Sequence, residues 1–150
     1  MKFLCDQMLG TLAKWLRIYG LDTLYATDDL DDNKLIEIAK KENRILITRD
    51  IQLIYKSRRE NIKSIKVTEK NIDEQLNQVL KKVKIDKEFF LSRCLLCNSL
   101  VSEINKNDIK NKVPNRIFKN NENFWYCKKC DKIYWQGSHF KNMIQKINSL

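Results

Sequence analysis

The sequence has no long apolar run, no internal repeat and no low-complexity linker. A membrane-spanning helix needs roughly 18 consecutive apolar residues, and no stretch of the chain approaches that length. An apolar signal region is also missing, because Asp6 and Lys14 interrupt the apolar residues near the start. We therefore expect a cytoplasmic protein without a membrane partner.

Histidine occurs once, as His139, whereas cysteine occurs five times. Four of the cysteines form two CxxC pairs: Cys94 with Cys97, and Cys127 with Cys130. In a reducing compartment, two such pairs indicate a tetrathiolate zinc site rather than two disulfides. Because four thiolates already fill the zinc shell, we interpret His139 as structural. Cys5 lies inside a predicted buried strand and is interpreted as a small core residue.

Basic charge is concentrated in the C-terminal part of the chain, whose overall net charge is +10. Residues 1–90 carry 18 Lys and Arg against 15 Asp and Glu, whereas residues 91–150 carry 11 against 4. Four thiolates on Zn²⁺ remove only two charges, so the C-terminal part stays basic and favours a polyanionic partner. The alternative interpretation is a solvated surface rich in Lys and Asn.

Two short apolar runs, residues 3–6 and 45–50, each end on an aspartate. Such runs are typical of strands buried on both faces of a parallel sheet, whose chemistry lies beyond the carboxyl ends of the strands. We therefore expect Asp6 and Asp50 to face one crevice. A further acidic cluster lies between them in the chain: Asp28, Asp29, Asp31 and Asp32. Carboxylates repel by about 4 kcal/mol per pair at 4 Å and a dielectric near 20, which predicts a bound divalent cation.

The hydrophobic periodicity predicts alternating strands and helices up to residue 88. The predicted strands cover residues 3–6, 23–26, 44–48 and 65–67, and the predicted helices cover about 9–19, 33–42, 51–59 and 72–83. Either Asp31 or Asp32 should cap the second helix. This alternation implies right-handed crossovers and a three-layer α/β fold, with helices on both faces of a parallel sheet.

The composition of the sequence changes at residue 89. The part that follows contains the cysteine pairs and a polar segment rich in Asn and Lys. The spacing of the pairs suits two zinc knuckles joined by hairpin strands, which is a small zinc ribbon. Its core is too small to fold without metal. An amphipathic segment from Phe140 to Ile147 predicts a final helix. We therefore predict two domains, 1–88 and 89–150.

Four motifs occur together in this order: CDQMLGTLAKWLR at 5–17, LITRD at 46–50, the two CxxC pairs, and WQGSH at 135–139. In this combination the chain resembles a PIN-like ribonuclease family with an appended C-terminal zinc ribbon. That family is named after the C-terminal domain of the Mut-seven protein. The resemblance covers nearly the whole chain and implies a PIN-like nuclease domain at 1–88, followed by a zinc-ribbon domain with a C-terminal helix.

The resemblance also implies which residues act. The metal-binding acids of the family correspond to Asp6 and Asp50, and the middle acid is most similar in position to Asp32, with Asp31 as an adjacent candidate. Only Glu69 follows the fourth predicted strand, so operation with one or with two metal ions stays open. Mg²⁺ or Mn²⁺ would bind these hard oxygen ligands, activate water and stabilise the charge of the transition state.

The predicted substrate-binding residues are Lys14, Arg17, Thr48, Arg49, Lys128 and Lys129. The basic side chains would hold RNA phosphates, and Thr48 would also orient the carboxylates.

Three functions compete at this point. The first is a metal-dependent endoribonuclease in which the zinc ribbon helps to bind RNA. The second is a non-catalytic RNA-binding protein built on a degenerate nuclease fold. The third, a phospho-receiver, needs two adjacent acids after the first strand, but Gln7 follows Asp6. It also needs a lysine after a fifth strand, which the pattern does not offer, so the third function is disfavoured.

Overall fold

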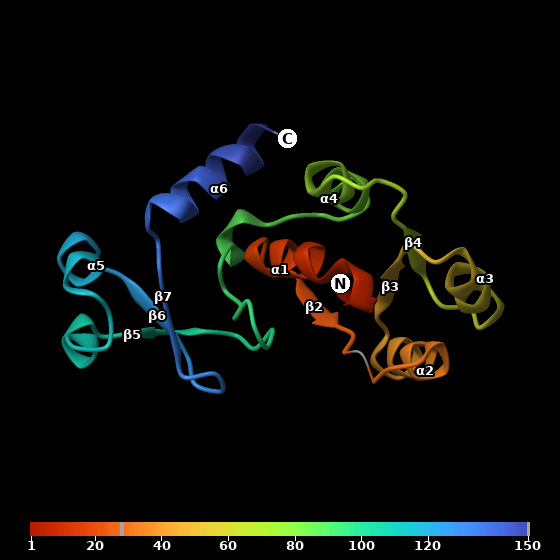
Figure 1. Cartoon of the computed structure of the whole chain (residues 1–150), viewed down its shortest axis with the longest axis horizontal. Helices are drawn as coiled ribbons and strands as arrows, with labels where there is room; N and C mark the ends of the chain where they lie inside the picture. The colour runs from red at the N-terminus through yellow and green to blue at the C-terminus, as the bar shows by residue number, and fades with distance from the viewer. Residues whose placement is uncertain (28, 150) are drawn as a thin grey trace. The chain divides into compact units, whose positions relative to one another are not determined.

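The computed structural model describes residues 1–27 and 29–149, so Asp28 of the predicted acidic cluster lies outside the described residues. The chain forms two compact units, residues 1–98 and residues 99–150 (Figure 1). Among the helices of the described residues, none combines the length and apolar character that crossing a membrane requires.

A parallel sheet with the strand order β2-β1-β3-β4 organises the first unit. Its strands are β1 (Lys2–Cys5), β2 (Asp22–Tyr25), β3 (Ile45–Thr48) and β4 (Ser64–Lys66). In the register, Leu4 of the central strand β1 lies opposite both Leu24 and Leu46. Because β1 and β3 are parallel neighbours, their carboxyl ends meet at the same edge of the sheet. The predicted parallel α/β fold is confirmed, and Asp6 and Asp50 follow strands that end at this edge.

Four helices cover the two faces of this sheet. They are α1 (Gly10–Ile18), α2 (Asp32–Glu42), α3 (Ile51–Arg59) and α4 (Ile72–Leu80). Helix α1 packs against α4, and α2 packs against α3. Figure 1 shows the two pairs on opposite faces, which gives the predicted three layers. Of the two predicted caps of α2, the structure selects Asp31, whose carboxylate accepts the Lys34 N–H at 2.9 Å.

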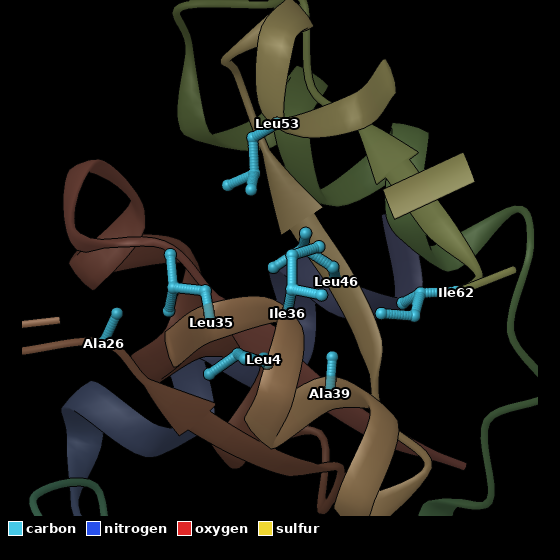
Figure 2. Close-up of a cluster of buried hydrophobic side chains, with 8 residues drawn as sticks. All are labelled: Leu4, Ala26, Leu35, Ile36, Ala39, Leu46, Leu53 and Ile62. Atoms are coloured by element: carbon cyan, nitrogen blue, oxygen red, sulfur yellow. The ribbon is translucent and has the colours of Figure 1, made fainter. Parts of the chain in front are cut away.

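The core beneath α2 and α3 holds the strands in place. Figure 2 shows Leu4 of β1 and Leu46 of β3 meeting Leu35 and Ile36 of α2. Each fully buried leucine of this kind contributes about 1.5–3 kcal/mol of burial free energy. Successive side chains of a strand alternate between faces, so Cys5 points toward the opposite layer, where it is fully buried. Burial raises the pKa of its thiol, which fits the predicted role as a core residue.

The segment after α4 also belongs to the first unit. Leu91 donates its N–H to the Ile18 carbonyl at the end of α1 (2.9 Å), and Tyr19 packs edge-to-face on Phe90. Gly20 has a φ of 78°, and a Cβ there would lie 2.1 Å from the Phe89 carbonyl oxygen. Glycine is therefore required for the close approach of this segment to the end of α1.

The second unit contains an antiparallel sheet with the order β5-β6-β7. Its strands are β5 (Ser102–Ile104), β6 (Phe124–Cys127) and β7 (Lys132–Trp135), and its helices are α5 (Asn115–Asn120) and α6 (Ser138–Ser149). The buried core consists of Ile109, Val113 and Phe124. The small antiparallel sheet of the predicted zinc ribbon is confirmed. The sequence prediction did not give bounds for its hairpin strands, and it missed α5 and the contribution of Ile109 and Val113 to the core. The signal for it was the four-residue spacing of Ile109, Val113 and Ile117.

Candidate functional site

A chain of hydrogen bonds joins Asp6 and Asp50 at the carboxyl edge of the parallel sheet. Asp6 follows β1 and is only 7% exposed. Its Oδ1 accepts the Met8 N–H (2.8 Å), and its Oδ2 accepts the Thr48 hydroxyl (2.5 Å). The same hydroxyl oxygen accepts the Asp50 N–H at 3.0 Å. The Thr48 hydroxyl thus connects the Asp6 carboxylate to the backbone of Asp50.

Asp50 is held by its position at the start of α3. Its Oδ1 accepts the Gln52 N–H at 2.8 Å, which makes Asp50 the N-cap of the helix. The residue is otherwise exposed, whereas Asp6 is buried. One acid therefore lies within the protein and the other faces solvent, and both are fixed by the local hydrogen bonds of their turns.

The acids before α2 take a different arrangement. Asp31 caps the helix and Asp32 is its first residue, and both are exposed. In the parts of the chain that the structure describes, the four cysteines form the only group of three or more potential ligands with converging donor atoms. The structure therefore does not bring Asp6, Asp50 and either Asp31 or Asp32 into one such group.

The predicted phosphate-binding residues differ in their surroundings. Lys14 is exposed on α1. Arg49, which lies between Thr48 and Asp50 in the sequence, is partly buried. Lys128 and Lys129 are exposed between the cysteines of the second pair.

Arg17, which the sequence predicts to bind phosphate, is only 5% exposed. Its Nε donates to the Thr23 carbonyl (2.9 Å) and its Nη1 to the Leu95 carbonyl (2.7 Å). These bonds tie the start of the zinc knuckle to β2, which favours a structural role over direct phosphate binding. No sequence pattern indicates this burial, because both acceptors are backbone carbonyls.

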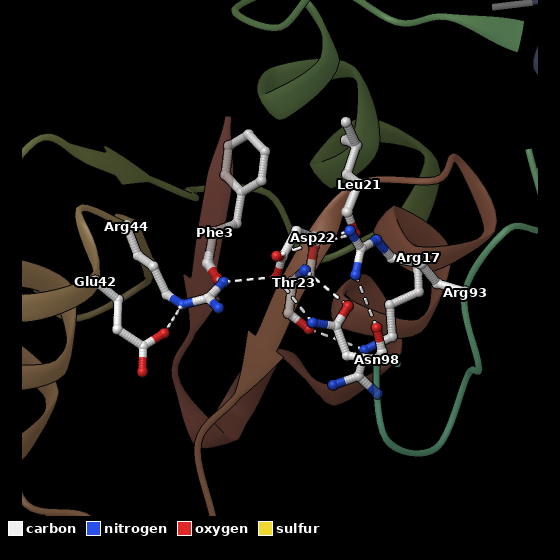
Figure 3. A network of polar contacts seen from close by, with 9 residues as sticks. All are labelled: Phe3, Arg17, Leu21, Asp22, Thr23, Glu42, Arg44, Arg93 and Asn98. Atoms are coloured by element: carbon white, nitrogen blue, oxygen red, sulfur yellow. Dashed lines mark hydrogen bonds and ion pairs between the residues drawn. The ribbon is translucent and has the colours of Figure 1, made fainter. Parts of the chain in front are cut away.

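Asn98 makes structural contacts that the sequence analysis did not predict. Figure 3 shows it against the edge strand β2, where it accepts the Thr23 N–H (2.9 Å) and donates to the Asp22 carboxylate (2.8 Å). Arg44 also donates to Asp22, at 2.7 Å. Burial alone would raise the pKa of Asp22, but the hydrogen bonds from Arg44 and Asn98 and the nearby charges of Arg44 and Arg93 hold it below its ordinary value. Asn98 thus pairs the outward-facing Thr23 N–H on the edge strand β2, while Arg17 pairs the Thr23 carbonyl.

The four paired cysteines have the chemistry and the spacing of a zinc site. Their sulfur atoms all lie within 4.8 Å of one another, and Cys94 and Cys127 are buried. A tetrahedral zinc site with Zn–S bonds of about 2.3 Å has sulfur atoms about 3.8 Å apart, so the group needs little contraction. Thiolates are the ligands that structural zinc prefers. The residues therefore fit a structural zinc ion.

The comparison with protein families matches the chain over almost its entire length. The family model of the Mut7-C RNAse domain matches residues 1–147. The chain belongs to this family. The match spans both the Asp6–Asp50 edge and the cysteine group of this Mut7-C chain. Comparison with curated proteins gives no match. Membership of the Mut7-C RNAse domain family suggests a ribonuclease-type function with RNA as the substrate class.

We expect Asn98→Ala to destabilise this Mut7-C domain by about 2–4 kcal/mol. It leaves the buried Thr23 N–H unpaired, which costs about 1–3 kcal/mol, and places alanine at a φ of 68°, which adds about 1 kcal/mol. Urea unfolding of the zinc-loaded protein measures the change. Asn43→Ala is the matched control, because Asn43 has a φ of 52° but is exposed. Equal destabilisation by the two variants would contradict a role for the Asn98 side chain.

Proposed function

We propose that the chain is a metal-dependent endoribonuclease that hydrolyses RNA phosphodiester bonds, and that its basic zinc-ribbon residues increase RNA affinity. The observation that carries the proposal is the Asp6–Thr48–Asp50 chain of hydrogen bonds. It lies at the carboxyl edge of a parallel sheet, which is where α/β proteins place their sites. Its occurrence in a chain of the Mut7-C RNAse domain family supports the assignment.

The donor set suits a hard divalent cation. Asp6 and Asp50 would hold Mg²⁺ or Mn²⁺, with Asp32 or Asp31 as a further ligand. Each Asp6 oxygen already accepts one hydrogen bond, and a carboxylate oxygen has a second lone pair for a metal. When bound, the ion supplies an activated water and stabilises negative charge on the phosphate.

The side chains around these acids have separate tasks in the proposal. Thr48 holds the Asp6 carboxylate in one orientation. Binding of the ion therefore costs no further ordering of the Asp6 side chain. Lys14 and Arg49 provide positive charge for the phosphates beside the scissile bond. Lys128 and Lys129, which are exposed in the second unit, contribute charge to RNA affinity without reading bases.

The decisive experiment supplies the divalent ion to zinc-loaded protein. The zinc-loaded chain is dialysed against buffer without Mg²⁺ or Mn²⁺ and mixed with labelled single-stranded and structured RNAs. We expect internal cleavage only after Mn²⁺ or Mg²⁺ is added. The products should lack 2′,3′-cyclic phosphates, because water rather than the RNA 2′-hydroxyl attacks. EDTA is avoided, since a chelator would also remove the zinc.

The alternative is a non-catalytic RNA-binding protein. The observation in its favour is that the described acids do not form one convergent group of three. RNA binding without cleavage by either ion, across the whole set of RNAs, would establish this alternative and contradict the nuclease proposal. Cleavage that does not depend on the added ion, or that yields cyclic phosphates, would also contradict it.

A further inference from the structure

The first unit contains a pocket of about 300 Å³ between α1, the end of β2 and the first zinc knuckle. Its lining includes Gly10, Lys14, Arg17, Tyr25, Leu95 and Leu96. Two of them are cations, and none of the described lining residues is acidic. A pocket of this size can hold one small ligand, and its charge favours an anionic one.

Tyr25 gives the pocket a fixed aromatic wall. Its hydroxyl donates to the Gln7 carbonyl at 2.6 Å, while 39% of the residue stays exposed. A Cβ on Gly10 would lie 3.1 Å from Cζ of the Tyr25 ring. The absence of a side chain at Gly10 therefore lets the ring lie close to the first turn of α1. An exposed aromatic ring held in this way can stack on a base with little loss of entropy.

The other side of the pocket comes from the knuckle. Leu96 lies between Cys94 and Cys97, and it is 57% exposed. Arg17 anchors this loop through its bond to the Leu95 carbonyl (2.7 Å). Lys14 also lines the pocket, one helical turn after Gly10, and is exposed. The pocket thus combines two apolar surfaces with an accessible ammonium group, which suits a nucleobase attached to a phosphate.

We propose that this pocket binds one nucleotide of an RNA strand, with its base against Tyr25 and Leu96 and a phosphate at Lys14. The proposal rests on the proposed function, because the nucleotide is taken to lie next to the bond that is cut. Tyr25 pairs with Cys5 in the sheet register, and Asp6 follows Cys5. A base held at Tyr25 would therefore bring the neighbouring phosphodiester toward the Asp6 edge. Stacking tolerates any base, so the pocket positions RNA without selecting its sequence.

The test measures RNA affinity by fluorescence anisotropy, using the zinc-loaded full chain without Mg²⁺ or Mn²⁺ so that the RNA stays intact. Tyr25→Leu should weaken binding of a single-stranded RNA about tenfold, since stacking on one aromatic ring is worth about that much. Tyr25→Phe keeps the ring and should stay within about threefold of the wild type. Lys14→Gln should weaken binding and reduce the salt slope by about 1.

The matched controls are Tyr55→Leu and Lys41→Gln, which change exposed residues on α3 and α2. Both should bind RNA like the wild type. Circular dichroism and thermal unfolding check that every variant is folded. Competition with 5′-AMP shows whether the pocket binds a nucleotide within RNA or a free nucleotide. If 5′-AMP displaces RNA only weakly, the pocket is an RNA subsite. If 5′-AMP binds tightly and displaces RNA at low concentration, the pocket is a free-nucleotide site and the proposal is overturned.

The outcomes for the pocket and for the nuclease are distinguishable. If the wild type cleaves RNA but Tyr25→Leu and Lys14→Gln bind normally, the pocket proposal is wrong and the nuclease proposal stands. If no ion supports cleavage but Tyr25→Leu loses affinity, the pocket binds RNA and the hydrolysis proposal is wrong. The pocket proposal would be overturned if Tyr25→Leu and Tyr55→Leu lost RNA affinity equally. It would also be overturned if the wild type showed no measurable RNA binding.

Discussion

Replacing Asp50 with Asn is expected to reduce RNA cleavage by about 10³-fold, which corresponds to about 4 kcal/mol of activation free energy. The substitution removes the negative charge that would bind the cation but keeps the size of the side chain. The carbonyl oxygen of the introduced amide can still accept the Gln52 N–H and cap α3, and the Thr48 bond uses only the backbone of this residue. The fold should therefore persist. Initial cleavage rates in Mn²⁺ measure the effect.

Asp86→Asn is the matched control for this prediction. Asp86 also caps a helical turn through a bond to the N–H two residues later, and it is also exposed. It lies outside the Asp6–Asp50 edge, so its variant should cleave at the wild-type rate. Without divalent ions, Asp50→Asn should bind RNA at least as tightly as the wild type, because one repulsive charge is gone. Wild-type cleavage by Asp50→Asn would show that this carboxylate takes no part in the reaction.

Replacing Cys127 with Ser is expected to abolish zinc binding and unfold residues 99–150. The apolar core of this unit is a small cluster built on Ile109, Val113 and Phe124. Structural zinc contributes about 10–16 kcal/mol in small domains of this kind, far more than such a core supplies. Metal analysis should fall from about one zinc per chain to near zero. Hydrogen exchange should show that β6 and β7 lose protection while β1 and β3 keep theirs.

Cys5→Ala separates zinc ligation from general damage. Cys5 is completely buried in β1 and lies outside the cysteine group, so this variant loses core packing but should keep its zinc. Full zinc occupancy in Cys127→Ser would contradict the four-cysteine site. Recovery of two disulfides from the native protein under reducing conditions would contradict it as well.

The elements of the first unit could be predicted because their signals are local. Short apolar runs indicated β1 and β3, and the stripe of Leu9, Leu12 and Leu16 indicated α1. The two-aspartate edge followed from topology, since adjacent parallel strands end on the same side. The predicted zinc ligands also depended only on spacing, and the structure brings all four cysteines together.

The features that escaped prediction depend on contacts between distant residues. Arg17 is buried because it binds a carbonyl 78 residues away, and no periodicity records such a bond. Asn98 follows a CxxC pair, which marks a turn but not its partners on β2. The small core around Ile109 was hidden because its apolar residues are separated by charged and amide side chains. The positions of the acids before α2 were also beyond reach, since a capping aspartate and a metal ligand have the same sequence signal.

The pairing of Asn98 with Thr23 has a consequence for the order in which the protein acquires its structure. A ribosome makes the chain from the N-terminus, so Thr23 of β2 emerges 75 residues before the Asn98 side chain that accepts its N–H. Until then the nascent sheet presents an open strand, and such edges recruit strands from other chains. A truncated product that ends before the first CxxC pair would keep this edge permanently open. We therefore expect the first knuckle to protect this edge of the sheet only once residue 98 has been synthesised.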